Sequence, residues 1–238
     1  MITMKDYSLK IGDFSLCDVN LQIKDNKIFA LLGETGAGKT VLLEALAGFY
    51  DSNCGDIRYG DIPVKDIPLK DRRIGFVYQD FSLFPHMTVR DNIEFGLKMH
   101  RIPLRNRRKI SYDVMNKLKI EHLKSRYPET LSGGEKQRTA LARAIVLKPQ
   151  VLFMDEPFSA LDPATREQMY EIIKEIHGTY NCTVIFVTHN FNEAAVLADR
   201  VGVMIGGRLR EVCNSCELFR DHDDYEVMKF LGKEEALS

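Results

Sequence analysis

An octet of residues near the N-terminus combines glycines with one lysine and one threonine. The stretch GETGAGKT, residues 33–40, fits the pattern G-x-x-x-x-G-K-[ST]. Its glycines let the backbone curve around a phosphate, and a following helix adds positive potential at its N-terminus. Lys39 would place its charge at the β- and γ-phosphates, and Thr40 would offer a hydroxyl to Mg²⁺. We therefore predict a phosphate-binding loop here, with nucleotide contacts from Gly33, Glu34, Thr35, Gly36, Ala37, Gly38, Lys39, Thr40 and Val41.

Two acidic residues end a later apolar run. In VLFMDEP, four apolar residues are followed by Asp155 and Glu156. In open α/β sheets, ligands bind at the edge where the strands end. Asp155 is predicted to hold Mg²⁺ directly or through water, and Glu156 to polarise an attacking water. The alternative is that both acids cap the helix after Pro157, but the nearby phosphate loop favours the catalytic interpretation.

Two further apolar runs end in polar side chains that could contact a phosphate, a metal ion or a water molecule. TVIFVTHN ends its strand at His189, and GFVYQ ends at Gln79. A single histidine is more often structural than catalytic, but a place at the ligand edge of the sheet reverses that preference. His189 could contact the γ-phosphate and hold Glu156 and the water in register. Gln79 could offer its amide oxygen to Mg²⁺ or to the water.

The stretch LSGGEKQR, residues 131–138, places two glycines directly before a run of good helix formers. A glycine inside a helix costs about 1 kcal/mol relative to alanine. Gly133 and Gly134 therefore form either an ordinary helix entry or a backbone surface that approaches a ligand. The residue types alone leave both alternatives open.

The elements that must position these residues alternate along the chain. The opening YSLKIGDFSLCDVNLQI alternates apolar and polar residues and predicts two short strands joined at Gly12-Asp13. From about residue 84 to 148 the chain is mainly helical in pattern. Strands alternating with helices predict a parallel sheet covered on both faces, with the helical block as a second lobe. Buried strands are predicted at residues 27–33, 73–79, 151–155, 183–189 and 200–207.

Composition restricts the function classes. The 238 residues carry a net charge of −1, and 45% are hydrophobic, so no overall field favours nucleic acid. The basic cluster RNRRK, residues 105–109, is predicted to be a solvated face. The cysteines are expected to be reduced thiols, and Cys213 with Cys216 lacks a second pair at metal-ligand spacing. No apolar run approaches the roughly 18 residues of a membrane span, so any membrane action would need a partner chain.

These motifs, taken in order, resemble the nucleotide-binding subunits of ATP-binding-cassette (ABC) transporters. GETGAGKT corresponds to the Walker A motif, Gln79 to the Q-loop and LSGGEKQ to the signature. VLFMDE corresponds to the Walker B motif, SALD at 159–162 to the D-loop, and His189 to the H-loop. The likeness extends from about residue 5 to 220, and LSGGEKQR is its most specific part.

The resemblance implies a P-loop NTPase (RecA-like) α/β core with an N-terminal antiparallel β subdomain and an inserted α-helical subdomain. The core would comprise residues 1–83 and 150–238, and the helical subdomain residues 84–149. It also implies an ATPase that uses ATP and Mg²⁺, with Glu156 and His189 as catalytic residues and Thr40, Gln79 and Asp155 at the metal.

The resemblance further implies a homodimer in which each ATP lies between two subunits. The signature residues would act on the partner's ATP, with Asp162 in the D-loop; they are Leu131, Ser132, Gly133, Gly134 and Glu135. Such a dimer would sit at the cytoplasmic face of the membrane and drive transmembrane permease subunits, with an extracytoplasmic substrate-binding protein acting indirectly. We expect permease contacts near Gln79 to Val89, and no binding to nucleic acid.

Within the family the chain looks most like importer subunits of the molybdate/tungstate type, and we expect it to lack the C-terminal regulatory β-domain that many such subunits carry. Alternatives are import of sulfate, polyamines, sugars or iron, export, a non-hydrolysing regulator, and a soluble ATPase acting on nucleic acid or ribosomes. Two positions depart from the family pattern. Ile11 stands where an aromatic residue commonly stacks on adenine, with Phe14 as the possible substitute, and Glu34 replaces a small residue or proline.

Overall fold

The computed structural model describes residues 1–233 and divides the chain into two compact units. One unit joins Met1–Arg72 to the chain from Thr183 onward, and the other is Arg73–Cys182. These bounds differ from the division expected from the sequence, because two core strands and a long helix fall in the second unit. The predicted division into a nucleotide-binding core and a helical subdomain stays a prediction. Residues 234–238 of the predicted core lie outside the part of the chain that the structure describes.

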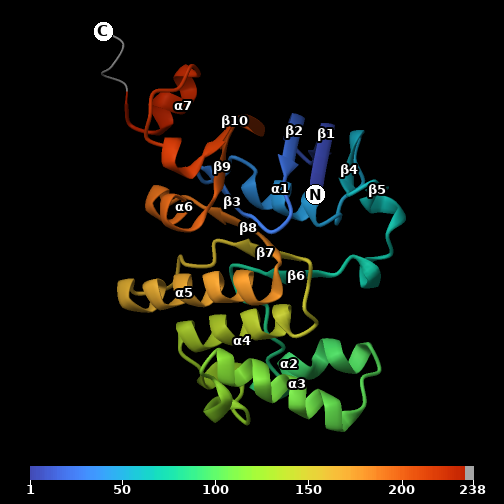
Figure 1. Cartoon of the computed structure of the whole chain (residues 1–238). Coiled ribbons are helices and arrows are strands. Elements are labelled where there is room, and N and C mark those ends of the chain that lie inside the picture. Colours follow the sequence, from blue (N-terminus) through green and yellow to red (C-terminus); the bar gives the residue numbers. More distant parts are fainter. Residues whose placement is uncertain (234–238) are drawn as a thin grey trace. The chain divides into compact units, whose positions relative to one another are not determined.

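An antiparallel sheet in the first unit confirms the predicted opening hairpin (Figure 1). Its strand order is β2-β1-β4-β5. The Ile11 and Phe14 ends of β1 and β2 pair across the turn at Gly12-Asp13. The side chains of Ile2, Met4 and Leu9 in β1 are buried, as expected for a sheet with one face on a core. The strand bounds are β1 Ile2–Ile11, β2 Phe14–Ile23, β4 Cys54–Tyr59 and β5 Ile62–Pro63.

The first unit also holds the strand that leads into the phosphate loop. This strand, β3, lies between β8 and β9 and is parallel to both, while β10 pairs with β9 antiparallel (Figure 1). All residues of β3 and β8 are buried, which explains their continuous apolar sequences. The bounds are β3 Ile28–Gly33, β8 Thr183–Thr188, β9 Arg200–Ile205, β10 Arg208–Asn214, α1 Lys39–Leu46, α6 Phe191–Leu197 and α7 Tyr225–Phe230.

The second unit consists of a parallel strand pair, β6 and β7, and four long helices. Helix α4 packs closely on β6, since a Cβ at Gly75 would lie 2.6 Å from the backbone oxygen of Ala144. Helix α2 contacts both α3 and α4. The helical character predicted for residues 84–148 is confirmed by α2, α3 and α4. The bounds are β6 Ile74–Val77, β7 Val151–Asp155, α2 Val89–Met99, α3 Leu104–Lys117, α4 Gly133–Ile145 and α5 Pro163–Tyr180.

Short 3₁₀ turns complete the secondary structure. They are Val64–Asp66, Leu69–Asp71, Glu121–Leu123, Pro128–Thr130 and Ser215–Glu217. Each spans three residues, as is usual for this helix type. None of the described helices has the length and apolar character needed to cross a bilayer.

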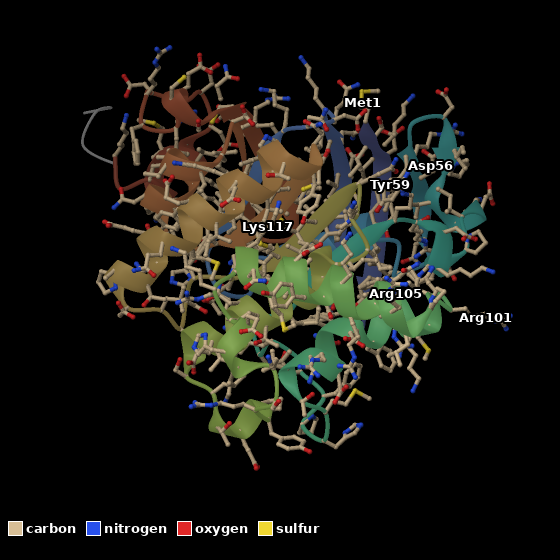
Figure 2. The ribbon with its side chains drawn as sticks, turned by 60° about the horizontal axis from the view of Figure 1, so that its bottom comes forward. Met1, Asp56, Tyr59, Arg101, Arg105 and Lys117 are labelled. Atoms are coloured by element: carbon tan, nitrogen blue, oxygen red, sulfur yellow. The ribbon has the colours of Figure 1, made fainter. Side chains whose placement is uncertain are left out.

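The basic cluster of residues 105–109 lies in α3 and is mostly exposed, as predicted. Figure 2 shows the labelled Arg105 at the molecular surface. Two of its arginines also have a structural use, because Arg107 Nε and Arg108 Nη1 each lie 3.5 Å from the carboxylate of Glu94. Glu94 is buried and also accepts a hydrogen bond from the Ser111 hydroxyl at 2.8 Å. The pairs hold α3 on α2.

Candidate functional site

The phosphate loop between β3 and α1 has a backbone that only glycine accommodates at several positions. Gly36 and Gly38 have φ of 84° and 95°, in the left-handed region. A Cβ at Gly33 would lie 2.4 Å from the backbone oxygen of Met204. The amide of Ala37 donates to Glu34 O at 3.1 Å and closes the loop. The loop is therefore formed by the first unit itself.

Lys39 and the first turn of α1 supply the positive charge of this loop. The Lys39 side chain is 5% exposed, and its Nζ donates to Gly33 O at 2.8 Å and Glu34 O at 2.9 Å. Helix α1 begins after Gly38 without any side-chain cap. Thr40 is exposed and Val41 half-buried at this helix end. A lysine bonded to loop carbonyls and an uncapped helix N-terminus together favour a bound polyphosphate.

Phe14 lies against the phosphate loop. A Cβ at Gly38 would fall 2.2 Å from Phe14 Cζ, so the tip of the ring packs directly on the glycine. Ile11 is 37% exposed at the end of β1. The structure thus brings Phe14 to the loop that was assigned to nucleotide binding.

A pocket of about 570 Å³ opens beside the outer side of the same loop. Its walls are the loop, the end of β9 and helix α7. Helix α7 was not predicted from the sequence. Its Phe230 ring packs on Phe191 of α6, with ring centroids 5.1 Å apart. The lining residues are Glu34, Thr35, Gly36, Ala37, Met204, Ile205, Gly206, Glu226, Lys229 and Phe230.

His189 directly follows β8, in the same unit as the phosphate loop. Its side chain is exposed, as a contact to a bound ligand requires. The preceding Thr188 is buried; its hydroxyl donates to the Glu193 carboxylate and accepts from the Asn190 amide at 3.0 Å. These bonds fix the end of the strand on both sides of the histidine.

In the second unit, β7 ends at Asp155 as predicted, and the chain turns sharply at Glu156, which follows it. Asp155 is 5% exposed. Glu156 has φ of 42°, a conformation that costs a residue with a side chain roughly 1–3 kcal/mol. Ser159 holds this turn, since its amide and hydroxyl both donate to Glu156 O, at 3.3 and 3.0 Å. Strained backbone of this kind is common at functional sites.

The residues expected at Mg²⁺ have the donor chemistry that this ion needs. Thr40 and Gln79 are exposed and offer a hydroxyl and an amide oxygen, and Asp155 offers a carboxylate. Mg²⁺ prefers such hard oxygen ligands, commonly one or two carboxylates together with substrate phosphates. Within residues 1–233, no cluster of three or more His, Cys, Asp or Glu side chains could hold a metal. All five cysteines, Cys213 and Cys216 included, are free thiols.

The glycines of LSGGEKQR begin helix α4. Ser132 is its N-cap: its hydroxyl accepts from the Glu135 amide at 3.4 Å, and its own amide donates to the Glu135 carboxylate at 2.7 Å. The hydrogen bond from the Ser132 amide lowers the pKa of Glu135. Leu131 is buried under the helix start. This capping box leaves the amides of Gly133 and Gly134 at the helix N-terminus, where no intrahelical acceptor exists.

The D-loop residue Asp162 caps the next helix, α5. Its carboxylate accepts from the Thr165 amide at 3.0 Å, and the hydrogen bonds with Thr165 lower its pKa. The start of α4 lies on this region, because a Cβ at Gly134 would be 3.1 Å from Thr165 Cγ2. Within the second unit, the signature and D-loop residues are thus brought together.

Three side chains with a clear role in this unit were not predicted from the sequence. Arg143 donates to the carbonyls of Ser82 at 2.7 Å and Phe81 at 3.0 Å. Asn92 is fully buried and makes hydrogen bonds to the backbone of the same loop. Gln137 donates to Pro157 O, immediately after Glu156. The sequence signal for such residues is a polar side chain at a position that falls, by helical periodicity, on the same face as the buried apolar residues.

Comparisons with known proteins agree with this arrangement. Residues 16–159 match the family model described as ABC transporter. A molybdate/tungstate import ATP-binding protein of Pyrococcus horikoshii is 40% identical over 100% of this chain and 69% of the relative. The protein of the same description from Pyrococcus abyssi is 42% identical over the same shares. A sulfate/thiosulfate import ATP-binding protein of Synechocystis is 38% identical over 99% of this chain and 67% of the relative.

Solved structures are similar over most of the chain. A dimeric ATP-binding cassette in a post-hydrolysis state, bound to ADP and Pi, has a TM-score of 0.82 and 29% identity, covering 90% of this chain and 99% of that one. A Clostridium perfringens protein that is part of an ABC transporter complex has a TM-score of 0.83 and 30% identity, with 92% and 90% coverage. These matches confirm the expected P-loop NTPase fold. The chain belongs to the ABC transporter family and is one of its ATP-hydrolysing subunits.

Proposed function

We propose that the chain is the ATPase subunit of an importer and acts as a homodimer on the cytoplasmic face of the membrane, bound to a separate permease. The observation that carries the proposal is the phosphate loop, whose lysine lies on loop carbonyls beside an uncapped helix start. The import function is supported by the relatives, whose names describe them as import ATP-binding proteins.

In this proposal, the loop of residues 33–40 binds the triphosphate of ATP, with Lys39 at the β- and γ-phosphates. Thr40, Gln79 and Asp155 would hold Mg²⁺, which would neutralise charge on the phosphate oxygens. Glu156 accepts the proton of the attacking water. His189 contacts the γ-phosphate and keeps that water aligned.

The signature acts on the ATP of the other subunit. Residues 131–135 would place the N-terminus of α4 at that γ-phosphate, with the amides of the two glycines, which have no intrahelical acceptor, as donors. Asp162 of the D-loop belongs to the same surface. The dimeric state of a similar solved cassette supports this arrangement. ATP binding then closes the dimer, and hydrolysis opens it.

The permease would contact the loop from Gln79 to Val89, which joins β6 to α2. Arg143 and Asn92 hold this loop, so a displacement at Gln79 is carried to its far end. A surface pocket of about 260 Å³ lies beside it and offers a docking site whose walls carry apolar, basic and acidic side chains. Its lining residues are His86, Met87, Asp91, Glu94, Phe95, Lys98, Arg107 and Arg108. The extracytoplasmic binding protein acts through the permease.

For the substrate, we propose a tetrahedral oxyanion, with molybdate or tungstate as the first candidate and sulfate or thiosulfate as the alternative. The names of similar import proteins include both pairs. Reconstitution with the permease and its binding protein decides between them. Molybdate is expected to stimulate ATP hydrolysis at lower concentration than sulfate, and the reverse order would reassign the substrate.

Glu156→Gln tests the catalytic proposal. The variant keeps the shape of the side chain but cannot accept a proton, so phosphate release should fall at least about 100-fold. ATP binding should stay near that of the unchanged protein, and a closed dimer should accumulate with ATP. Glu167→Gln, the same change on an exposed face of α5, is the control. Wild-type turnover in Glu156→Gln would remove Glu156 as the base.

A further inference from the structure

A polar side chain on the buried face of α4 reaches the chain that follows Glu156. Gln137 is 2% exposed, and its Nε2 donates a hydrogen bond to the carbonyl oxygen of Pro157. Its Oε1 is also buried and has no hydrogen-bond partner among the described residues. An unsatisfied buried oxygen costs folding free energy. An apolar side chain would avoid that cost but would leave the carbonyl oxygen of Pro157 without this donor, so the amide at this position serves the backbone that follows Glu156.

The acceptor of this hydrogen bond lies at a strained turn. Glu156 holds a left-handed φ of 42°, which its surroundings must impose. Ser159 binds the carbonyl of Glu156 through its amide and its hydroxyl, and Gln137 binds the next carbonyl along the chain. These contacts fix two successive carbonyl groups. The direction of the Glu156 side chain depends on this backbone.

The same helix begins at the signature. Its first turn lies on the D-loop and the start of α5, because a Cβ at Gly133 would be 3.7 Å from Ala160 O and one at Gly134 would be 3.1 Å from Thr165 Cγ2. The capping box at Ser132 makes this turn of helix rigid. Gln137 follows one turn later. The signature and the backbone of Glu156 are thus connected by one short stretch of helix within one unit.

We propose that Gln137 is a positioning residue that couples the signature of a subunit to the Glu156 of the same subunit. The inference rests on the proposed function, in which the signature serves one ATP of the dimer and Glu156 the other. Closure of the signature on the partner's ATP is carried along α4 to Pro157 and sets the backbone of Glu156. The two sites of the dimer are thereby linked through each chain.

Gln137→Glu tests this coupling because the side chain keeps its shape. As a carboxylate it cannot donate to Pro157 O, whereas the protonated acid can, and burial favours the protonated form at low pH. At pH 8, kcat for ATP hydrolysis should fall about tenfold, the equivalent of roughly one hydrogen bond. The KM for ATP should change by less than about twofold, since the change spares nucleotide contacts. The kcat ratio to wild type should recover towards pH 6, and the Hill coefficient for ATP should decrease at pH 8.

Two further variants complete the test. Gln168→Glu makes the same chemical change on an exposed face of α5 and should leave the pH profile of kcat as in wild type. Gln137→Met keeps the length without a donor and should show a low kcat at every pH, so it also serves if Gln137→Glu fails to fold. A wild-type kcat in Gln137→Met, or a fall in kcat of Gln137→Glu that acid does not reverse, would overturn the inference.

The inference and the proposed function can fail separately. If Glu156→Gln hydrolyses ATP at the wild-type rate, the proposed role of Glu156 fails, whatever Gln137 does. If Glu156→Gln is inactive and Gln137→Met is fully active, the catalytic proposal stands and only the coupling through Gln137 is lost.

Discussion

The phosphate loop and the signature are both glycine-containing helix starts, but their glycines answer different demands. At the phosphate loop, Gly36 and Gly38 have left-handed φ, and a side chain at Gly33 would collide with a backbone oxygen 2.4 Å away. At the signature, a Cβ at Gly133 would meet nothing closer than 3.7 Å, and one at Gly134 only a methyl group at 3.1 Å. The fold of the chain itself therefore requires the glycines of the phosphate loop far more than those of the signature.

Helix capping differs in the same direction. Helix α1 has no side-chain cap, whereas α4 has a complete capping box formed by Ser132 and Glu135. The N-terminus of α1 thus leaves its amides free of side-chain caps, so they can bind a ligand that the phosphate loop surrounds. The N-terminus of α4 is closed by its capping box, and its two glycines have ordinary helical backbone with no left-handed φ. Glycines that the backbone conformation of their own chain does not require are explained by a ligand that approaches the helix start, and this supports binding to the nucleotide of a second subunit.

The largest expected effect comes from Gly134→Asp. A carboxylate at residue 134 would add negative charge at the helix start that is proposed to bind the partner's triphosphate, so ATP hydrolysis should fall at least about 100-fold, the size seen for lost transition-state donors. ATP binding to the isolated monomer should stay within about threefold of wild type, because its own phosphate loop is intact. Equilibrium nucleotide binding and phosphate release measure the two effects.

The control for this variant is Gly178→Asp in α5, where a Cβ meets nothing within 4 Å. It should hydrolyse ATP normally. If Gly134→Asp weakens ATP binding to the monomer as much as it weakens hydrolysis, the signature serves its own subunit and the contrast between the two helix starts is lost.

A second prediction compares Gly33→Ala with Gly133→Ala by urea unfolding without nucleotide. The methyl group at residue 33 must displace the backbone at Met204, so the free energy of unfolding should fall by about 1–3 kcal/mol. The methyl group at residue 133 meets only Ala160 O, at an ordinary van der Waals distance of 3.7 Å, so the change should be within about 0.5 kcal/mol. Both variants should lose ATP hydrolysis. Equal destabilisation would mean that the signature glycines are needed by their own fold.

The smallest effect is expected from Phe14→Leu. If the ring contributes to base binding at the phosphate loop, ATP affinity should fall by about three- to tenfold, the usual range for an aromatic contact. The similar volume should limit the loss of unfolding free energy to about 1.5 kcal/mol. Phe219→Leu, at a side chain that is 50% exposed, should change neither quantity. An unchanged ATP affinity in Phe14→Leu would leave the ring a role in supporting Gly38 alone.

The sequence was sufficient where a pattern is local. The phosphate loop needs eight adjacent residues, and the buried strands of the parallel pairs are unbroken apolar runs, so both were predictable. Strands β4 and β10 were missed because their burial is partial and charged residues such as Arg58 and Arg210 interrupt the apolar pattern. Helix α7, with six residues, is too short for a clear period.

Most of the site residues were placed by motif, whereas their supports were not. Gln137 finds its acceptor 20 residues away, and Arg143 reaches carbonyls 61 and 62 residues away. Side-chain bonds to the backbone carry no local signature, because the acceptor can belong to any residue type. The left-handed φ of Glu156 is equally invisible in the sequence, since it depends on the turn after β7.

The buried Asn92 has a consequence for exchange with solvent. Its Oδ1 accepts from the Phe84 amide at 2.8 Å, and its Nδ2 donates to the carbonyls of Phe84, Met87 and Thr88, each at 3.1 Å. An amide bonded to a buried side chain exchanges with deuterium only when that contact opens. Phe84 is therefore a slow-exchanging position within a loop of otherwise irregular backbone. The exchange rate of this single amide therefore reports how often the loop between β6 and α2 opens.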